Sequence, residues 1–421
     1  MSRAPITTAL GLSTRVRSVS LSANAAAGQR AAALAAQGRD IIALNAGEPE
    51  FDTPEPIKQA AIAALRRGET KYTATAGTAT LRRAIAAKYA RENGLAFAPA
   101  EILASNGGKQ VIFSAFAATL DPGDEVILPA PYWPSFPDIV RVNGGHPAIV
   151  RCDERSGFKL TASALQAAIT PRTRWLVLNT PSNPTGAVYT EGELRGLAEV
   201  LRAHPQVAVL LDELYEHIWF TPQAPVHWLH VAPDLRERTL LVNGASKTYA
   251  MTGWRIGWGA GPKALVDAMT VIQSQVSSAP NAIAQAAVTA ALDDPDQSFV
   301  AQARAAYARR ADFVVRGINA IDGLSVLPLA GSFFAYVHCG ALLGRERPDG
   351  RTIASDDDLV DWLLEAGVAV VAGAGFGLSP YFRLSTAAGD AALAEALRRI
   401  AAAVAALQAP ASAKSALAAG A

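Results

Sequence analysis

The sequence has few cysteines and almost no excess charge, and both absences exclude classes of protein. Cys152 and Cys339 are the only cysteines among 421 residues, and they lie far apart without the spacing of metal ligands. This argues against a disulfide framework or a zinc site, and a reducing cytosol is the expected compartment. The 38 basic and 37 acidic residues leave a net charge of +1, so no global field favours nucleic acid or an anionic membrane.

Long apolar runs are also missing. No segment approaches the length needed to span a bilayer, and no positively charged start leads into a compact apolar block like that of a secretory signal. The first 39 residues hold five arginines and no acid, a composition that resembles a transit peptide, but the alanine-rich stretch 22–37 instead predicts an arm and helix that continue into the fold. We expect a soluble, cytoplasmic protein that acts on small molecules and binds no nucleic acid, membrane or metal.

Half of the residues are hydrophobic, which is enough for a large core and two domains. Helical stretches alternate with buried apolar strands up to about residue 300, which predicts an α/β domain with a mainly parallel sheet covered by helices on both faces. The expected strands are 102–104, 125–128, 147–151, 175–179, 207–212 and 239–242.

A different pattern follows the helical stretch 297–321 and predicts a smaller α+β domain. Its expected strands are 324–327, 332–338, 368–371 and 381–384, and its expected helices are 357–366 and 387–407. We divide the chain into an arm with part of the small domain (1–54), a large domain (55–310), the small domain (311–408) and a disordered tail (409–421).

Lys247 stands at the centre of the most informative stretch. The short apolar run 239–242 predicts a buried strand, so Ser246 and Lys247 emerge at its carboxyl end, where open α/β sheets bind ligands. A lysine in apolar surroundings loses hydration, which lowers its pKa and frees the amine to attack aldehydes. Arg255, eight residues later, can hold a phosphate together with Ser246. The pattern suggests a pyridoxal-phosphate site, although a surface lysine with a nearby arginine has the same spacing.

Ser-Lys followed by Met-Thr-Gly-Trp-Arg-Ile-Gly-Trp, residues 246–258, resembles the lysine signature of class I aminotransferases, particularly the branch that contains bacterial aspartate aminotransferases. The resemblance extends from Ser22 to about Leu407. It implies fold type I, in which a mixed, mainly parallel seven-stranded sheet forms the large cofactor domain beside the smaller α+β domain. It also implies pyridoxal 5'-phosphate as the cofactor, attached covalently to Lys247.

A glycine-rich turn follows the predicted strand 102–104. Gly107, Gly108 and Lys109 precede an apolar helix, and backbone amides at a helix start bind phosphate. A glycine pair between strand and helix is also an ordinary turn. The turn resembles the phosphate-binding turn of the family, which implies that these three residues bind the cofactor.

Three further residues at strand ends match the family's cofactor contacts. Asp212 ends an apolar strand and resembles the aspartate that keeps the ring nitrogen protonated, although an aspartate there can also cap a helix. Tyr215 and Asn183 resemble the pair that bonds the phenolic oxygen of the cofactor. The resemblance therefore implies that Lys247, Asp212 and Tyr215 are the catalytic residues.

Two aromatic residues complete the expected cofactor site. Trp133 follows the predicted strand 125–128 and resembles the residue that stacks on the cofactor ring, although an aromatic there also suits the core. Tyr72 resembles a tyrosine that reaches the phosphate of the neighbouring subunit. The resemblance implies a homodimer with active sites shared across a two-fold axis.

The substrate carboxylates call for cationic partners. Arg383 matches the arginine that binds the α-carboxylate, although an arginine on a strand is ordinarily solvated, and Gly47 adds a backbone contact. Lys109 matches a lysine that meets the side-chain carboxylate of aspartate or glutamate, although a lysine there can also be an ordinary solvated side chain. Trp133 and Asn183 are also expected to contact the substrate.

Four positions bear on side-chain recognition. Ser22 and Asn24 lie in the arm that is expected to close over the substrate, and Asn24 stands where threonine is expected. Ala372 stands where a Pro-Gly turn is usual, and Phe334 where tyrosine is frequent. These departures leave the substrate side chain open.

We therefore expect a ping-pong aminotransferase that acts on aspartate and 2-oxoglutarate. An aminotransferase for aromatic or prephenate-type donors stays open as a second reading of the same site. The fold would also suit a pyridoxal-phosphate carbon–sulfur lyase or a ligand-sensing protein, although no basic helix-turn-helix segment is left over for a DNA-binding sensor.

Overall fold

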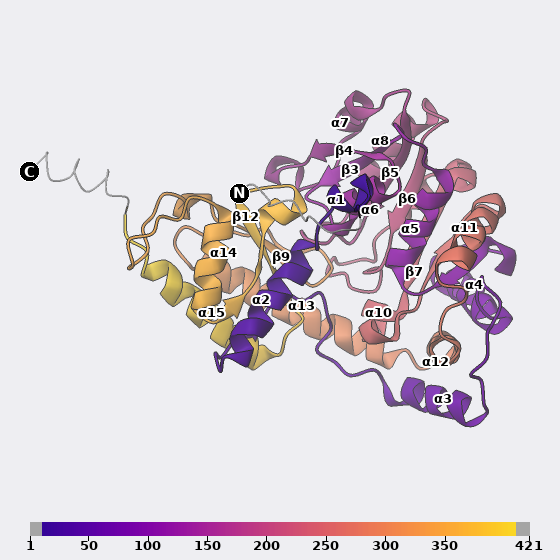
Figure 1. The fold of residues 1–421 in the computed structure, drawn as a ribbon, viewed down its shortest axis with the longest axis horizontal. Coiled ribbons are helices and arrows are strands. Elements are labelled where there is room, and N and C mark those ends of the chain that lie inside the picture. Colours follow the sequence, from indigo (N-terminus) through magenta and orange to yellow (C-terminus); the bar gives the residue numbers. More distant parts are fainter. Residues whose placement is uncertain (1–10, 410–421) are drawn as a thin grey trace, which may run out of the picture.

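The computed structural model describes residues 11–409, so the predicted tail, apart from residue 409, and residues 1–10 of the arginine-rich start lie outside the described residues. Figure 1 shows two parts side by side, a larger one around a central sheet and a smaller one that contains the last helices. None of the helices between residues 11 and 409 combines the length and the apolar character that a bilayer-spanning segment needs.

A seven-stranded sheet forms the centre of the larger part, in the order β2-β8-β7-β6-β5-β3-β4. The strands are β2 Ile102–Ser105, β3 Glu125–Ala130, β4 His146–Arg151, β5 Thr173–Asn179, β6 Ala208–Asp212, β7 Thr239–Gly244 and β8 Gly257–Ala260. Only β8 runs antiparallel to its two neighbours. The predicted mainly parallel, mixed sheet is confirmed, and β8 is the strand that the expected strand ranges omitted.

Alternate residues of each strand enter different cores, because successive side chains point to opposite faces of a sheet. In β6, Val209 and Leu211 join one hydrophobic cluster, whereas Leu210 joins the other. The first cluster also contains residues of α3, α4, α8 and α12, and the second contains residues of α5, α6 and α11. Helices therefore cover both faces, as predicted. The helices of this part are α3 Glu55–Arg66, α4 Ala79–Asn93, α5 Gly108–Thr119, α6 Ser135–Val142, α7 Ala162–Ala168, α8 Glu191–Arg202, α9 Trp228–Val231, α10 Ala245–Thr248, α11 Lys263–Val276 and α12 Ala282–Asp293.

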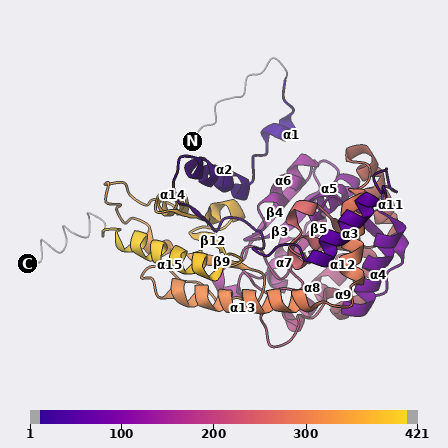
Figure 2. The same ribbon diagram turned by 90° about the horizontal axis from the view of Figure 1, so that it is seen from below.

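The smaller part is built on the antiparallel sheet β11-β12-β9 and the parallel pair β1-β10. The strands are β1 Ile42–Ala43, β9 Phe334–His338, β10 Val368–Ala369, β11 Val371–Ala372 and β12 Tyr381–Ser385, and the helices are α2 Ala23–Ala36, α13 Ser298–Asn319, α14 Asp356–Glu365 and α15 Asp390–Ala405. The short helix α1 Thr14–Arg17 contacts α6 of the larger part. Helices α13 and α15 contact each other, and they run side by side in Figure 2. The arm helix predicted within residues 22–37 corresponds to α2.

Two strand predictions in the smaller part are wrong. Residues 324–327 form no strand and keep one isolated bridge, between Ser325 and His338, because the backbone N–H and C=O of Val326 are bonded to the Asn319 side chain instead of to a strand. The expected strand 368–371 is two strands, since β10 pairs with β1 and β11 pairs with β12 in another sheet. The domain boundaries at residues 55, 311 and 409 stay predictions.

Strand β8 lies against the start of α5, and Gly257 is the point of closest approach. A Cβ atom on Gly257 would lie 2.4 Å from the backbone nitrogen of Gly108 and 2.7 Å from the carbonyl carbon of Gly107. Gly253, four residues earlier, has nothing within 4 Å of the same position.

We expect Gly257→Ala to lower the free energy of unfolding by about 1–3 kcal/mol, because backbone atoms of α5 cannot move aside as a side chain can. Denaturant unfolding of the purified protein measures the change. Gly253→Ala is the matched control and should have little effect. Equal stability of the two variants would show that β8 and α5 are not packed this closely.

Candidate active site

The carboxyl ends of β5, β6 and β7 meet at one edge of the large sheet and surround a cavity of about 140 Å³. Most of the predicted site residues lie together here, although they are spread over the sequence from Gly108 to Arg255. The cavity is lined by Gly108, Lys109, Ile112, Trp133, Asn179, Asn183, Asp212, Leu214, Tyr215, Ser246, Lys247 and Arg255.

Lys247 lies in α10, the single helical turn that follows β7. Its Nζ donates a hydrogen bond to the carbonyl oxygen of Gly47, at 2.5 Å. Burial lowers the pKa of Lys247 to about 8; Glu48 opposes this shift, whereas Arg255 adds to it. The interpretation as a solvated surface lysine is therefore wrong, and the buried amine loses its proton more readily than an ordinary lysine.

Asp212 is the last residue of β6 and is buried. Its Oδ1 accepts a hydrogen bond from the backbone nitrogen of Leu214, at 3.2 Å, so Asp212 caps a tight turn and not a helix. Burial raises the pKa of Asp212 to about 7; the Leu214 amide opposes this rise, Glu213 adds to it, and Lys247 opposes it. The next hydrogen-bonding group in the turn, Tyr215, has a pKa raised by burial.

Asn183 joins the tyrosine to the predicted carboxylate-binding arginine. Its side chain is hydrogen bonded to Tyr215, and its Oδ1 accepts from Nη1 of Arg383 at 3.0 Å. Arg383, on β12, also donates from Nη2 to the carbonyl oxygen of Asn45 at 2.6 Å. Three segments distant in sequence therefore meet at Asn183.

Arg383 is fully buried, so the interpretation as a solvated arginine is wrong. It does not line the cavity, but lies directly behind Asn183. Burial lowers the pKa of Arg383 to about 10, against the opposing effect of Tyr215, and the group stays cationic at neutral pH. Its guanidinium carbon lies 4.2 Å from the ring centroid of Phe334. Its Nε has no hydrogen-bond partner within residues 11–409.

The start of α5 forms a positively charged end of the cavity. Gly107 has φ +90°, and a Cβ atom there would lie 2.3 Å from Nη2 of Arg255. The absence of a side chain at Gly107 thus lets the Arg255 guanidinium lie over the first turn of α5, beside Gly108 and Ser246. Helix amides, a hydroxyl and a guanidinium are the donors that a phosphate requires.

Lys109 is a second cation in the cavity. Its Nζ lies 4.9 Å from the ring centroid of Trp133, and burial followed by the charge of Arg255 lowers the pKa of Lys109. Within residues 11–409 it has no ion-pair partner. Trp133 lines the cavity and packs edge-to-face on Phe136, so it serves both as a wall of the site and as part of the core.

Some predicted residues lie outside the cavity. Tyr72 is 96% exposed and contributes nothing to the cavity of its own chain. Gly47 reaches the site through its carbonyl oxygen. In the arm, Ser22 accepts a hydrogen bond from the Ala25 amide and caps α2, and the Oδ1 of Asn24 is buried without a partner among the described residues.

Three cavity residues were missed by the sequence analysis. Asn179 ends β5, and its Nδ2 donates to the carbonyl oxygen of Asp212 at 3.1 Å. Its place at the same sheet edge as Asp212 was a usable signal. Ile112 and Leu214 carried no such signal, because apolar residues in a helix and a turn suit the core equally well.

Comparison with known proteins identifies the family. The model for aminotransferases of class I and II matches residues 39–400. An aspartate aminotransferase of Rhizobium meliloti (strain 1021) is 52% identical over 390 residues, which cover 92% of this chain and 95% of that protein. An aspartate/prephenate aminotransferase of Cereibacter sphaeroides is 50% identical over 372 residues, which cover 88% and 93%.

Solved structures agree with these matches. An aspartate aminotransferase from Rhizobium meliloti has a TM-score of 0.91 at 51% identity, over 95% of this chain and 100% of that chain. The Thermus thermophilus aspartate aminotransferase with maleate has a TM-score of 0.87 at 42% identity, over 94% and 100%. The chain therefore belongs to the class I and II aminotransferases, within the fold type I enzymes that use pyridoxal phosphate.

Proposed function

We propose that this aminotransferase moves the amino group of aspartate to 2-oxoglutarate by a ping-pong mechanism. The observation that carries the proposal is the content of one cavity, in which a buried amine of lowered pKa lies near a buried carboxylate and two cations. The matches to aminotransferases favour transamination over the carbon–sulfur lyase and the ligand sensor.

The cavity suits the cofactor at each of its polar groups. The amides of Gly107, Gly108 and Lys109, with Ser246 and Arg255, are the donors proposed for the phosphate. Asp212 is proposed to hold the ring nitrogen and Trp133 to cover the ring, while Asn183 and Tyr215 hold the phenolic oxygen and Lys247 forms the covalent link. When bound, pyridoxal phosphate takes up the electrons that the substrate releases as it loses its Cα proton.

Lys247 is the proposed acid and base. Because burial lowers its pKa to about 8, a larger fraction of Nζ is neutral near pH 7 than in an ordinary lysine. The neutral amine accepts the Cα proton of the substrate, and the resulting ammonium returns a proton at a different atom. The same Nζ performs these transfers in reverse for the second substrate.

Substrate recognition is proposed to use separate cations for the two carboxylates. Arg383, with the backbone of Gly47, binds the α-carboxylate, and Trp133 and Asn183 complete its surroundings. Lys109 binds the side-chain carboxylate, because it lines the cavity beside Trp133 and has no ion-pair partner within residues 11–409. The Thermus thermophilus relative was solved with maleate, a dicarboxylate, which favours a dicarboxylate as the substrate of this chain.

Prephenate is the second candidate for the amino acceptor. Relatives that are about half identical to this chain are named aspartate/prephenate aminotransferases. Prephenate also carries two carboxylates, so Lys109 and Arg383 suit it by the same chemistry. Asn24 stands where threonine is expected in the arm, which leaves side-chain recognition there open.

A homodimer with shared sites is proposed from the position of Tyr72. The Tyr72 side chain is 96% exposed and lies outside the cavity of its own chain. A residue that completes the site of a second subunit has to be exposed in this way. A cytoplasmic location is proposed as well, since Cys152 and Cys339 are buried free thiols.

We expect acylation of Lys247 in cofactor-free enzyme to have its midpoint near pH 8 instead of 10.5, because the reagent reacts only with the neutral amine. Asp212→Asn should lower the midpoint further, since the Asp212 carboxylate favours the ammonium. Mass spectrometry of the labelled peptide measures the rate, and Lys247→Ala gives the background. A midpoint near 10.5 would contradict the buried amine.

The amino donor is tested by titrating holoenzyme with single amino acids while the absorbance of the bound cofactor is followed. We expect aspartate and glutamate to convert it, and Lys109→Met to reduce kcat/KM for aspartate about 10–100-fold through loss of one charged hydrogen bond. Neutral amino acids should be much less affected. Lys263→Met, an exposed substitution on α11, is the control. Conversion by neutral amino acids alone would remove aspartate as the substrate.

The shared site is tested with mixed dimers. Lys247→Ala and Tyr72→Ala should each lower activity as homodimers, but a heterodimer of the two regains about half of wild-type activity, because one of its two sites is complete. Differently tagged chains allow the heterodimer to be isolated and assayed. A heterodimer no more active than the Tyr72→Ala homodimer would place Tyr72 outside the partner's site.

A further inference from the structure

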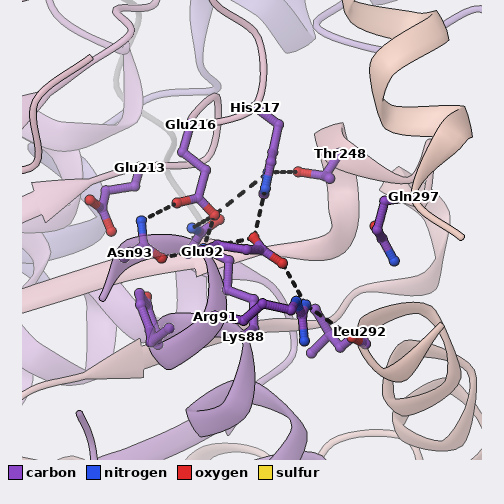
Figure 3. Close-up of polar contacts among 12 residues, drawn as sticks. Lys88, Arg91, Glu92, Asn93, Glu213, Glu216, His217, Thr248, Leu292 and Gln297 are labelled. Carbon is purple, nitrogen blue, oxygen red and sulfur yellow. Dashed lines mark hydrogen bonds and ion pairs between the residues drawn. The ribbon is translucent and has the colours of Figure 1, made fainter. Parts of the chain in front are cut away.

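A cluster of polar side chains lies next to the active site without lining its cavity. We call it the Glu216 cluster. Figure 3 shows Glu216 and His217 facing the side chains of α4, with Thr248 beside His217. The cluster consists of Lys88, Glu92, Asn93, Glu216, His217, Asn243 and Thr248, none of which lines the active-site cavity.

The charges of the cluster compensate one another within the chain. Glu92, Glu216 and His217 bring ligand atoms within 4.8 Å of one another, as a metal site would. The ammonium group of Lys88, which is 1% exposed, lies among them and bonds to Glu216 and to Asn93 Oδ1. Burial would raise the pKa of Glu216, but Lys88 and His217 outweigh burial and lower it. A lysine thus takes the place of a metal ion and keeps Glu216 ionised.

Two hydrogen bonds of the cluster join segments that carry proposed catalytic residues. The Nδ2 of Asn243, at the end of β7, donates to Glu216 at 2.8 Å. The hydroxyl of Thr248 is 3.1 Å from Nδ1 of His217. Glu216 directly follows Tyr215, and Thr248 directly follows Lys247. These bonds therefore tie the turn after Asp212 to the segment that contains Lys247.

The orientation of His217 follows from its second bond. Its Nε2 lies 2.9 Å from Oε2 of Glu92, and since a carboxylate only accepts, Nε2 carries a proton and donates to it. Its Nδ1 faces the Thr248 hydroxyl, which can either donate to this nitrogen or accept from it. Glu92 is itself 3.6 Å from the ammonium of Lys88, so two residues of α4 hold the imidazole ring in this orientation.

We propose that the Glu216 cluster is a positioning device that holds Lys247 at a set place relative to Asp212 and Tyr215. His217 and Thr248 are positioning residues, since they act through Lys247 and do not touch the cavity. The inference rests on the proposed role of Lys247. Small displacements of a reacting group reduce rates strongly. Because His217 and Thr248 do not line the cavity, their bond can affect the reaction only through the position of Lys247.

The Thr248 hydroxyl is tested by Thr248→Val, which keeps the shape of the side chain, and by Thr248→Ser, which keeps the hydroxyl. We expect the valine variant to lower kcat about 10-fold with KM nearly unchanged. In cofactor-free enzyme, its Lys247 labelling midpoint should rise by on the order of half a pH unit, as the amine becomes less tightly held in its buried place. The serine variant should restore both values.

Thr270→Val is the matched control, because the Thr270 hydroxyl donates to the Val266 carbonyl oxygen within α11, away from the cluster. It should leave kcat and the labelling midpoint unchanged even if its melting temperature falls. His217→Phe completes a double-mutant cycle with Thr248→Val. If the two side chains act through one bond, kcat of the double variant should be no lower than kcat of the more impaired single variant.

Three results would each overturn the inference. The first is a wild-type kcat and labelling midpoint in Thr248→Val, and the second is an equal fall in kcat in Thr248→Ser and Thr248→Val. The third is a double variant whose loss of kcat equals the sum of the two single losses in free energy. The labelling midpoint needs no cofactor or substrate, so it decides the positioning role even if aspartate is not the substrate. Unchanged midpoints in an enzyme that transaminates aspartate would refute the Glu216 cluster and leave the proposed function intact.

Discussion

The removal of charged groups from water at the carboxyl edge of the seven-stranded sheet is the constraint on which the site depends. Burial is the largest cause of the lowered pKa values of Lys247 and Arg383 and of the raised pKa of Asp212. Lys247 and Asp212 lie where three parallel strands end, Arg383 reaches the same edge from β12, and the adjoining strands are apolar on both faces. A buried charge is costly unless it is paired, so each group is either bonded to a neighbour or directed at the cavity.

The smaller part of the protein supplies the other half of the site. Segment β1 leads to Asn45 and Gly47, whose carbonyl oxygens accept hydrogen bonds from Arg383 and Lys247. Strand β12 carries Arg383, which reaches across to Asn183 in the larger part. A ligand carboxylate at Arg383 would therefore act on both parts, and the bond from Arg383 to the Asn45 carbonyl oxygen brings together segments more than 300 residues apart.

Polar groups serve two purposes around this edge. Asp212, Lys247, Lys109 and Arg255 line the cavity and are available to a ligand. The Glu216 cluster is instead satisfied within the chain, because Lys88 provides the cation that its carboxylates require. The two sets are joined by the backbone, since Tyr215 precedes Glu216 and Lys247 precedes Thr248. Each of the proposed catalytic residues Tyr215 and Lys247 is therefore followed directly by a residue of the Glu216 cluster.

The sequence by itself determined the sheet, the family resemblance and most of the cavity residues. Apolar strands that alternate with helices specify a covered sheet, and residues after such strands must meet at its edge. The short strand β8, the splitting of residues 368–371 between two sheets and the burial of Arg383 were decided only by the tertiary structure. Strand pairing and burial depend on partners distant in the chain, as do the bonds of Lys88 to Glu216 and of Thr248 to His217, and local sequence patterns carry no information about such partners.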